Sequence, residues 1–436
     1  MTWNSEVGAM AGEPTLASEA NLLNLFADTI SSGLAGEERL AKIVYLVVTS
    51  RLLDRIVSIV VKGPSSAGKS FVVEKVLSFF PDDAYYALSA MSEHAMAYGT
   101  EPLQHRFLVL YEAAGMHSDL ATYLVRSLLS EGRVRYETVE KVKGGGLKPR
   151  LIEREGPTGL IVTTTEVKLH PENETRLLSL TVSDTPGQTK AVLLAQAGES
   201  EPIDTEPWRD LQAWLAQQPN AVNIPYASQL AELIPPVAVR LRRDFPAVLA
   251  LIRSHAILHQ ATRARDHRQR VVATIEDYAV VRDLVADLVA EGAERTVSAT
   301  VRETVGVVAK LLAATDTTTV TSVAEALGLD KSATLRRVRV ATERGYVRNL
   351  EEKRGRPARL VLGDDLPDNF VVLPEPARLQ GCTPAGRRTS HATGSTSVQG
   401  EYPHLISTGA NAPTTVQPPL DEMSQRYLRS IGEMDA

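Results

Sequence analysis

The sequence predicts an α/β core built on a parallel β-sheet, then a helical region, and then a small domain of three helices and two strands. The core follows from apolar runs at 58–62, 107–112 and 158–165, which alternate with stretches of helical periodicity. The small domain follows from helical patterns at 301–315, 321–327 and 331–344, ahead of two strand patterns. Beyond about Pro374 the chain is rich in Pro, Gly, Ser and Thr, which predicts disorder.

These patterns divide the chain into five parts. We expect an N-terminal, partly disordered segment (1–34), the α/β core (35–185), an all-α region (186–298), the small domain (299–366) and a disordered tail (367–436) with a short helix at 421–431. In the core, a helix at 37–53 carries one apolar stripe, and it either packs on the sheet or closes over a bound ligand.

Composition narrows the function classes. The 436 residues carry a net charge of −6, so any nucleic-acid binding must come from local basic patches. Cys382 is the single cysteine, which excludes a disulfide framework and a cysteine-rich metal site. The N-terminus lacks the pattern of a signal peptide, and no apolar run approaches the length of a membrane span. We therefore expect a cytoplasmic protein with no membrane partner.

Residues 63–70 match the pattern G-x-x-x-x-G-K-[ST] between a predicted strand and a helix that begins near Lys69. The glycines let the backbone curl so that N–H groups face one phosphate, Lys69 reaches the β- and γ-phosphates, and the Ser70 hydroxyl binds Mg²⁺. The flanking strand and helix argue against an ordinary glycine turn. The expected ligands are thus ATP and Mg²⁺, held by Gly63, Pro64, Ser65, Ser66, Ala67, Gly68, Lys69, Ser70 and Phe71.

A second apolar strand, at 107–112, ends in the acid Glu112. Ligands of open α/β sheets lie at the carboxyl ends of the strands, where Glu112 would orient and polarise the attacking water. Tyr111 stands where such a segment usually carries an aspartate, and a phenol does not hold Mg²⁺ as a carboxylate does. The alternative is a buried strand with a carboxylate at its edge.

Alternating residues on both sides of a triple glycine at 144–146 predict a β-hairpin. Lys141, Lys143, Lys148 and Arg150 lie near its tip, and we expect the three lysines to contact DNA. The next apolar strand ends in hydroxyls at Thr164 and Thr165, and Arg176 follows in a polar stretch.

This order of motifs resembles the AAA+ ATPases with a hairpin before sensor 1, including the minichromosome maintenance (MCM) helicases and the NtrC-type activators. The resemblance covers about residues 35–290 and extends to the primase-associated helicases of phages and integrative elements. It implies that Thr165, or Thr164, senses the γ-phosphate and that Arg176 is an arginine finger for a neighbouring subunit. It also implies a helical lid over the nucleotide, with Arg243 as a loose candidate for sensor 2. A surface ion pair of Arg176 with Glu172 or Glu174 is the alternative.

The small domain resembles a winged helix whose third helix enters the major groove. Its wing carries an Arg-Gly-Arg-Pro run at 354–357, similar to the core of an AT-hook. The residues expected to contact DNA are Lys331, Arg336, Arg337, Arg339, Lys353, Arg354 and Arg356. The alternative is a winged helix that contacts protein.

We therefore expect an ATP-hydrolysing motor on DNA, a helicase or replication-initiation ATPase of a phage or mobile element. The resemblance implies a homo-oligomeric ring, expected to be a hexamer, with a primase or another replication protein as a further partner. The rival functions are a transcriptional regulator switched by ATP and a helicase loader. A basic run at 263–270 is expected to be a solvated loop, with a DNA-facing loop as the alternative.

Overall fold

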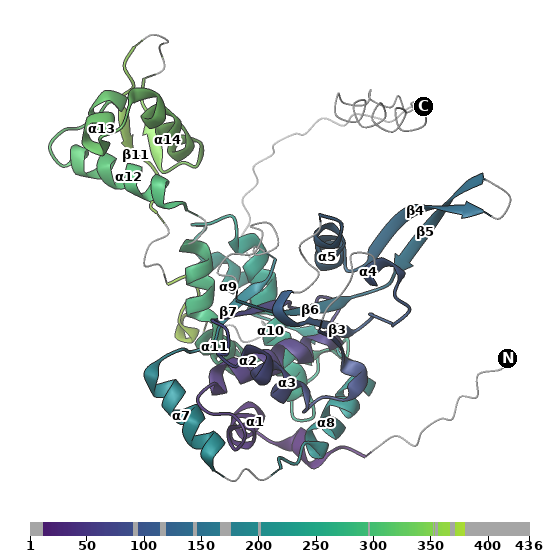
Figure 1. Ribbon diagram of the computed structural model, residues 1–436. Helices are drawn as coiled ribbons and strands as arrows, with labels where there is room; N and C mark the ends of the chain where they lie inside the picture. Colours follow the sequence, from purple (N-terminus) through teal and green to yellow (C-terminus); the bar gives the residue numbers. More distant parts are fainter. Residues whose placement is uncertain are drawn as a thin grey trace, which may run out of the picture. The chain divides into compact units, whose positions relative to one another are not determined.

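The computed structural model of the chain describes residues 12–89, 95–113, 119–142, 146–165, 176–198, 202–294, 297–351, 353, 356–366 and 371–379 (Figure 1). The N-terminal expectation for residues 1–11, the helix expected at 421–431, Lys143 and Arg354 all lie outside these ranges. Among the described helices, none combines the length and the apolar character that a bilayer span needs.

The centre of the chain is a five-stranded, fully parallel sheet in the order β2-β3-β6-β1-β7. This confirms the predicted mixed α/β core. The strands are β1 (Ile59–Lys62), β2 (Tyr85–Leu88), β3 (Arg106–Leu110), β6 (Thr158–Thr164) and β7 (Leu178–Thr181).

Successive strand residues point to opposite faces of the sheet and so enter two separate cores. Ile59 and Val61 belong to the larger core, with helices α2 (Glu38–Thr49) and α3 (Lys69–Leu77). Val60 belongs to the smaller core, with α5 (Asp119–Glu131). Because both faces are covered, the three central strands β1, β3 and β6 read as largely apolar runs in the sequence.

The segment before the sheet packs on the larger core. Helix α1 (Leu22–Ser31) follows the 3₁₀ turn η1 (Thr15–Ser18), and its Phe26 ring stacks on Tyr45 of α2 at 4.2 Å between centroids. Trp208 from α8 (Glu206–Gln217) meets Phe26 edge-on at 5.6 Å. The predicted packing role of the helix at 37–53 is therefore realised by α2 and the turn η2 (Ser50–Leu52).

The predicted hairpin is present as β4 (Val134–Val142) and β5 (Gly146–Arg154), with Val134 opposite Arg154 and Val142 opposite Gly146. Its base joins the smaller core through Val134 and the partly buried Tyr136. Helix α4 (Ala95–Tyr98) packs beside it, with Tyr98 edge-on to Tyr136. The remaining short elements of the core are η3 (Asp82–Ala84) and η4 (Tyr111–Ala113).

Beyond the sheet, the chain forms α7 (Pro186–Ala197), α8, α9 (Ala227–Leu233), α10 (Leu241–Leu258) and α11 (Ile275–Glu294). The expectation of an all-α region needs a correction, because β8 (Val222–Asn223) pairs in parallel with β9 (Val271–Val272). The pair is two residues long on each side, which is too short to produce a periodic sequence signal.

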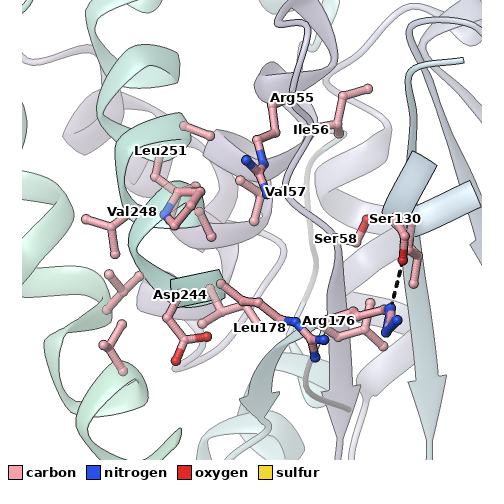
Figure 2. Close-up of a pocket in the computed structure, with 18 residues that line it drawn as sticks. Arg55, Ile56, Val57, Ser58, Ser130, Arg176, Leu178, Asp244, Val248 and Leu251 are labelled. Atoms are coloured by element: carbon pink, nitrogen blue, oxygen red, sulfur yellow. Dashed lines mark hydrogen bonds between the residues drawn. The ribbon is translucent and has the colours of Figure 1, made fainter. Parts of the chain in front are cut away.

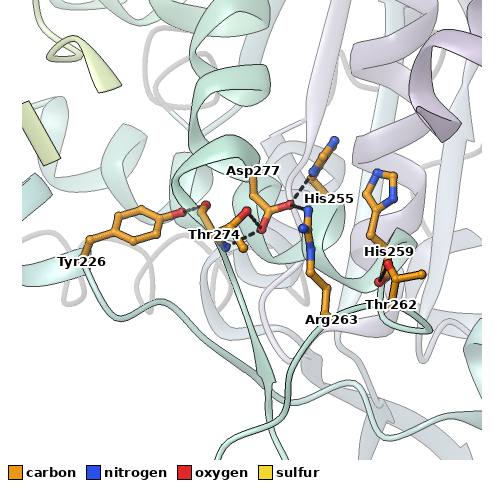
Figure 3. Close-up of polar contacts among 7 residues, drawn as sticks. All are labelled: Tyr226, His255, His259, Thr262, Arg263, Thr274 and Asp277. Atoms are coloured by element: carbon orange, nitrogen blue, oxygen red, sulfur yellow. Dashed lines mark hydrogen bonds and ion pairs between the residues drawn. The ribbon is translucent and has the colours of Figure 1, made fainter. Parts of the chain in front are cut away.

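A buried carboxylate ties α10 to α11 (Figure 3). Asp277 accepts hydrogen bonds from His255 Nδ1 at 2.7 Å, Arg263 Nη2 at 2.6 Å and the Thr274 backbone N–H at 2.6 Å. Burial acts to raise the pKa of Asp277, but the bonds from His255 and Thr274 and the charge of Arg263 outweigh it and keep that pKa below its usual value. In the basic run at 263–270, Arg263 pairs with the buried Asp277 and Arg270 pairs with Asp266, so these two cations are engaged within the protein.

Residues 297–366 have their own apolar core, built on Val305, Val308, Val323 and Val338. The predicted elements are all present as α12 (Ala299–Leu312), α13 (Val320–Leu327), α14 (Lys331–Glu343), β10 (Val347–Asn349) and β11 (Leu360–Leu362). The Asp330 side chain caps the start of α14, because it accepts hydrogen bonds from the N–H groups of Ser332 and Ala333. Gly328 ends α13 with its backbone in the left-handed region.

Residues 371–379, which we call the strap, return to α11 and end in the turn η5 (Pro376–Leu379). Leu373 and Leu379 are buried in the larger core, and the Tyr278 hydroxyl donates to the Pro374 carbonyl at 2.6 Å. The expectation of a tail without structure from residue 367 onwards is therefore wrong for the strap. Three apolar side chains of the strap, Val372, Leu373 and Leu379, are buried although the stretch is rich in proline.

Candidate active site

The loop between β1 and α3 is an open cradle at the carboxyl end of β1. Its backbone enters the left-handed region at Ser66 (φ 67°) and at Gly68 (φ 86°), and the Ala67 N–H donates to the Pro64 carbonyl at 3.2 Å. Glycine adopts that region at little cost, whereas a side chain at 68 would be strained. The predicted phosphate-binding residues 63–70 all lie in this loop or in the first turn of α3. Phe71 follows on the exposed side, with Lys75 Nζ 5.5 Å from its ring centroid.

Lys69 is the cation at the floor of this cradle. Its side chain is 3% exposed, and Nζ donates to the Pro64 carbonyl at 2.9 Å. The nearest carboxylate oxygen, Glu112 Oε1, lies 3.7 Å away, beyond hydrogen-bond distance. A buried ammonium with one neutral hydrogen-bond acceptor and one carboxylate at ion-pair distance can hold a further anion, which is the role expected of the phosphates.

Glu112 reaches the cradle from the end of β3. Its backbone is left-handed (φ 60°, ψ 24°), which is unusual for a residue with a side chain and is found preferentially at functional sites. Its side chain is 55% exposed. The structure thus brings together the predicted nucleotide lysine and the predicted catalytic acid, which are distant in sequence.

A residue that the sequence analysis did not single out holds Glu112 in this conformation. Thr163 of β6 is fully buried, and its Oγ1 accepts a hydrogen bond from the Glu112 N–H at 2.9 Å. Of the two sensor candidates, Thr164 is buried and pairs in register with Lys62, while Thr165 is exposed just beyond the strand. The only available signal was the run of three threonines, which does not distinguish one hydroxyl from the next.

Tyr111 packs against the larger core, and burial together with the negative charge of Glu74 raises the pKa of its phenol to about 12. It therefore stays protonated at neutral pH and does not take the place of a metal-binding aspartate. No group of three or more His, Cys, Asp or Glu side chains suited to a metal occurs among the described residues.

The predicted finger, Arg176, lies at the amino-terminal ends of the strands, opposite the end of the sheet that carries the phosphate loop. The parallel register places Ile59 opposite Leu178, so Arg176 precedes β7 where the strands begin, whereas the phosphate loop follows the end of β1. Its Nε donates to Ser130 Oγ at 2.9 Å (Figure 2). Glu172 and Glu174, the partners in the alternative ion pair, lie outside the described residues.

Arg243 is placed with Arg176 and not with Lys69. Both line a cavity of about 370 Å³ at this edge, together with Arg55, Ser130 and Asp244 (Figure 2). The expected role of Arg243 at its own nucleotide remains a prediction, and the structure places Arg243 beside Arg176 instead.

The basic residues of the hairpin are only partly described. Lys141 lies in β4 opposite Leu147, and the exposed Lys148 lies opposite Glu140. Arg150 is paired with Glu140. One face of the hairpin also exposes Val139, Leu147 and Leu151.

In the C-terminal domain (residues 297–366), the side chains predicted to contact DNA differ in whether they are exposed or engaged in ion pairs. Arg336 is exposed on α14, whereas Arg337 pairs with Glu303 of α12 at 2.7 Å and Arg339 pairs with Glu343 at 2.8 Å. Lys331 begins the helix and is exposed, as are Lys353 and Arg356 between β10 and β11.

No protein-family model matches the chain, and no curated protein sequence matches it. Among solved structures, a full-length MCM homolog from Methanopyrus kandleri is similar in fold, with 15% sequence identity and a TM-score of 0.42. The match covers 64% of this chain and 60% of that protein, so the chain spans less than two thirds of its length. At this level the likeness carries no functional argument.

Proposed function

We propose that the chain is an ATP-hydrolysing AAA+ motor that acts on DNA, as a helicase or replication-initiation ATPase of a phage or mobile element. The observation that carries the proposal is the convergence of Lys69 and Glu112, 3.7 Å apart, at the carboxyl ends of β1 and β3. A buried cation in a glycine cradle beside an exposed carboxylate is the arrangement that phosphoryl transfer to water requires.

Each residue then has one task. Lys69 and the loop N–H groups hold the β- and γ-phosphates, and the Ser70 hydroxyl contributes a ligand to Mg²⁺, which neutralises charge on the phosphate oxygens. Glu112 accepts a proton from the attacking water and orients it. Thr163 keeps the Glu112 backbone in place, and Thr165 or Thr164 senses the γ-phosphate.

Arg176 acts on a different nucleotide from the one that Lys69 holds. Strand β1 spans four residues, so roughly 13 Å of extended chain separates the two edges of the sheet. Arg176 is too far away to reach its own γ-phosphate and would complete the site of a neighbouring subunit. The active form is therefore a closed ring, which we propose to be a hexamer.

The DNA contacts are assigned to two places. The C-terminal domain acts as a winged helix that contacts DNA through four exposed cations, Lys331, Arg336, Lys353 and Arg356. In the hairpin, Lys148 with Lys141 and Lys143 contacts the DNA backbone. Phosphate contacts of this kind are sequence-independent and depend strongly on salt.

One observation favours a second candidate function, a helicase loader. Leu335 of α14 is 56% exposed and Leu350 beside the wing is 50% exposed, which suits contact with a protein. A primase or another replication protein would be the partner. Strand separation on a forked duplex distinguishes the motor, which unwinds it, from the loader and from a transcriptional regulator, which do not.

The proposal is tested by mixing two inactive variants. Lys69→Ala lacks the phosphate cation and Arg176→Ala lacks the finger, so each alone should lose ATP hydrolysis, by about a thousandfold for the finger. In the mixture, some interfaces join an intact Lys69 to an intact Arg176, and part of the turnover should return. Lys75→Ala, on the same helix as Lys69, is the matched control and should hydrolyse ATP normally. Normal turnover in Arg176→Ala would refute the trans-acting finger.

A further inference from the structure

The cavity at the amino-terminal edge of the sheet is lined by three arginines that come from distant parts of the chain. Arg55 lies in the loop before β1, Arg176 lies before β7, and Arg243 lies in the first turns of α10. Figure 2 shows Arg55 and Arg176 on two sides of this cavity, whose volume is about 370 Å³. Only the topology of the sheet brings these cations together.

Among the described residues that line the cavity, three are arginines and one, Asp244, is a carboxylate, on which the charge of Arg243 also acts. Asp244 lines it, but Arg240 Nε holds both Asp244 oxygens at 3.3 and 3.2 Å. Within the described part of the chain, no ion pair involves Arg55. Burial lowers the pKa of the Arg253 guanidinium, and the nearby charge of Arg55 lowers it further, so these two cations repel each other. Such a cluster favours a multiply charged anion.

We infer that Arg55 and Arg243 join Arg176 in one polyphosphate site, and that its ligand is the triphosphate held by the phosphate loop of a second copy of the chain. This inference rests on the proposed function, because it assigns more residues to the same interface. The ligand comes from outside the subunit, since the subunit's own phosphate loop lies at the opposite edge of the sheet. Arg55 would contact phosphate directly and so stabilise the charge that develops during transfer.

Phosphates of a nucleic-acid backbone have the same chemistry, and the experiment must separate the two sources. The variants are Arg55→Ala and Arg55→Lys in the full chain. Arg242→Ala is the matched control, because Arg242 is exposed on the same helix as Arg243 but lines a different cavity. The measurements are basal ATP turnover without DNA, affinity for a fluorescent ATP analogue, and affinity for single-stranded DNA.

Arg55→Ala should reduce basal turnover by about tenfold or more, because the transition state loses one hydrogen bond between charged groups. Its affinity for the ATP analogue should stay within about twofold of the wild type, because its own phosphate loop is intact. Arg55→Lys should be intermediate, since it keeps the charge but not the fork geometry. Mixing Arg55→Ala with Lys69→Ala should restore turnover, which a misfolded variant could not do.

Two outcomes overturn the inference. Wild-type basal turnover in Arg55→Ala, with Arg176→Ala inactive, would remove Arg55 from the site and leave the proposed function standing. Unchanged basal turnover with weaker DNA binding would assign Arg55 to nucleic acid instead. If Arg176→Ala also hydrolyses ATP normally, the trans-acting finger fails with Arg55, whereas normal hydrolysis in Lys69→Ala would overturn the proposed function itself, so the failures are distinguishable.

Discussion

Lys69 Nζ lies 3.7 Å from Glu112 Oε1, although 43 positions separate the two residues in the chain. One charge is buried and the other is more than half exposed, so the pair forms a boundary between the phosphate cradle and solvent. In the proposed mechanism, a phosphate would lie on the lysine side and an attacking water on the carboxylate side.

The first prediction concerns Glu112→Gln. The amide keeps the shape of the side chain but cannot accept a proton from water, so hydrolysis should fall by about a hundredfold or more. Binding of ATP should remain, because Lys69 and the loop are unchanged, and a fluorescent nucleotide titration beside a turnover assay checks both. Glu74→Gln on α3 is the control and should hydrolyse normally. A variant that cannot bind ATP would show instead that Glu112 is structural or a metal ligand.

The second prediction separates the structural and the positioning roles of two buried threonines of β6. Thr163 accepts from the Glu112 N–H, whereas Thr158 donates to the Leu103 carbonyl at 2.9 Å. Thr163→Val and Thr158→Val should each lower the free energy of unfolding by about 1–2 kcal/mol. Only Thr163→Val should also lower ATP turnover at saturating ATP, by about tenfold, because it releases Glu112. Equal turnover in the two variants would argue against a positioning role for Thr163.

The third prediction contrasts two neighbouring arginines of α14. Arg336→Ala should weaken binding of the full chain to duplex DNA, and the slope of log affinity against log salt should become shallower by about one. Arg337→Ala should leave that slope unchanged and cost less than about 1 kcal/mol of stability, because the side chain is occupied by Glu303 at a partly exposed position. Fluorescence anisotropy at several salt concentrations gives both slopes. Equal slopes in Arg336→Ala and the wild type would assign α14 to protein contacts.

The fourth prediction is a pH dependence of stability. Burial lowers the pKa of His259 to about 4, and His255 and Arg263 act in the same direction. The unfolded chain binds the proton more readily, so this contribution to stability is complete above about pH 6.5 and is lost as the pH falls towards 4. Between pH 7 and pH 5 the free energy of unfolding should drop by about 2 kcal/mol from this residue.

Urea unfolding at both pH values measures that drop. His259→Gln should reduce it by about 2 kcal/mol, whereas His267→Gln, at an exposed histidine, should retain all of it. If His259→Gln shows the full drop, the buried ring does not control the acid sensitivity of the α10–α11 region.

Much of the fold was predictable from local sequence. The glycine spacing at 63–70 and the apolar runs predicted the cradle and the parallel strands, because a sheet covered on both faces requires continuous apolar strands. The hairpin followed from alternation on both sides of the triple glycine. The position of Glu112 at the carboxyl end of β3 was predictable because an acid follows the apolar strand within two residues.

The rest depends on contacts between distant parts of the chain. Thr163 is one hydroxyl in a run of three, and only the register of β6 against β3 directs it to the Glu112 N–H. Arg55 and Arg243 have no local pattern in common with Arg176 and meet it only through the strand order. The strands β8 and β9 and the strap are likewise segments too short to leave a periodic signal in the sequence.

The strap makes α11 the anchor for both ends of the C-terminal domain. The chain leaves α11 at Glu294 and comes back at residues 371–379 to contact Tyr278 and Arg282 of the same helix. The C-terminal domain is thus an insertion between α11 and the strap. A deletion from residue 297 onwards would remove more than the domain: it would strip the cover from Tyr278 and leave the Arg282 guanidinium without the Leu373 carbonyl and Glu375. Excising 297–366 and rejoining the ends through a flexible linker would keep the α11 surface sealed.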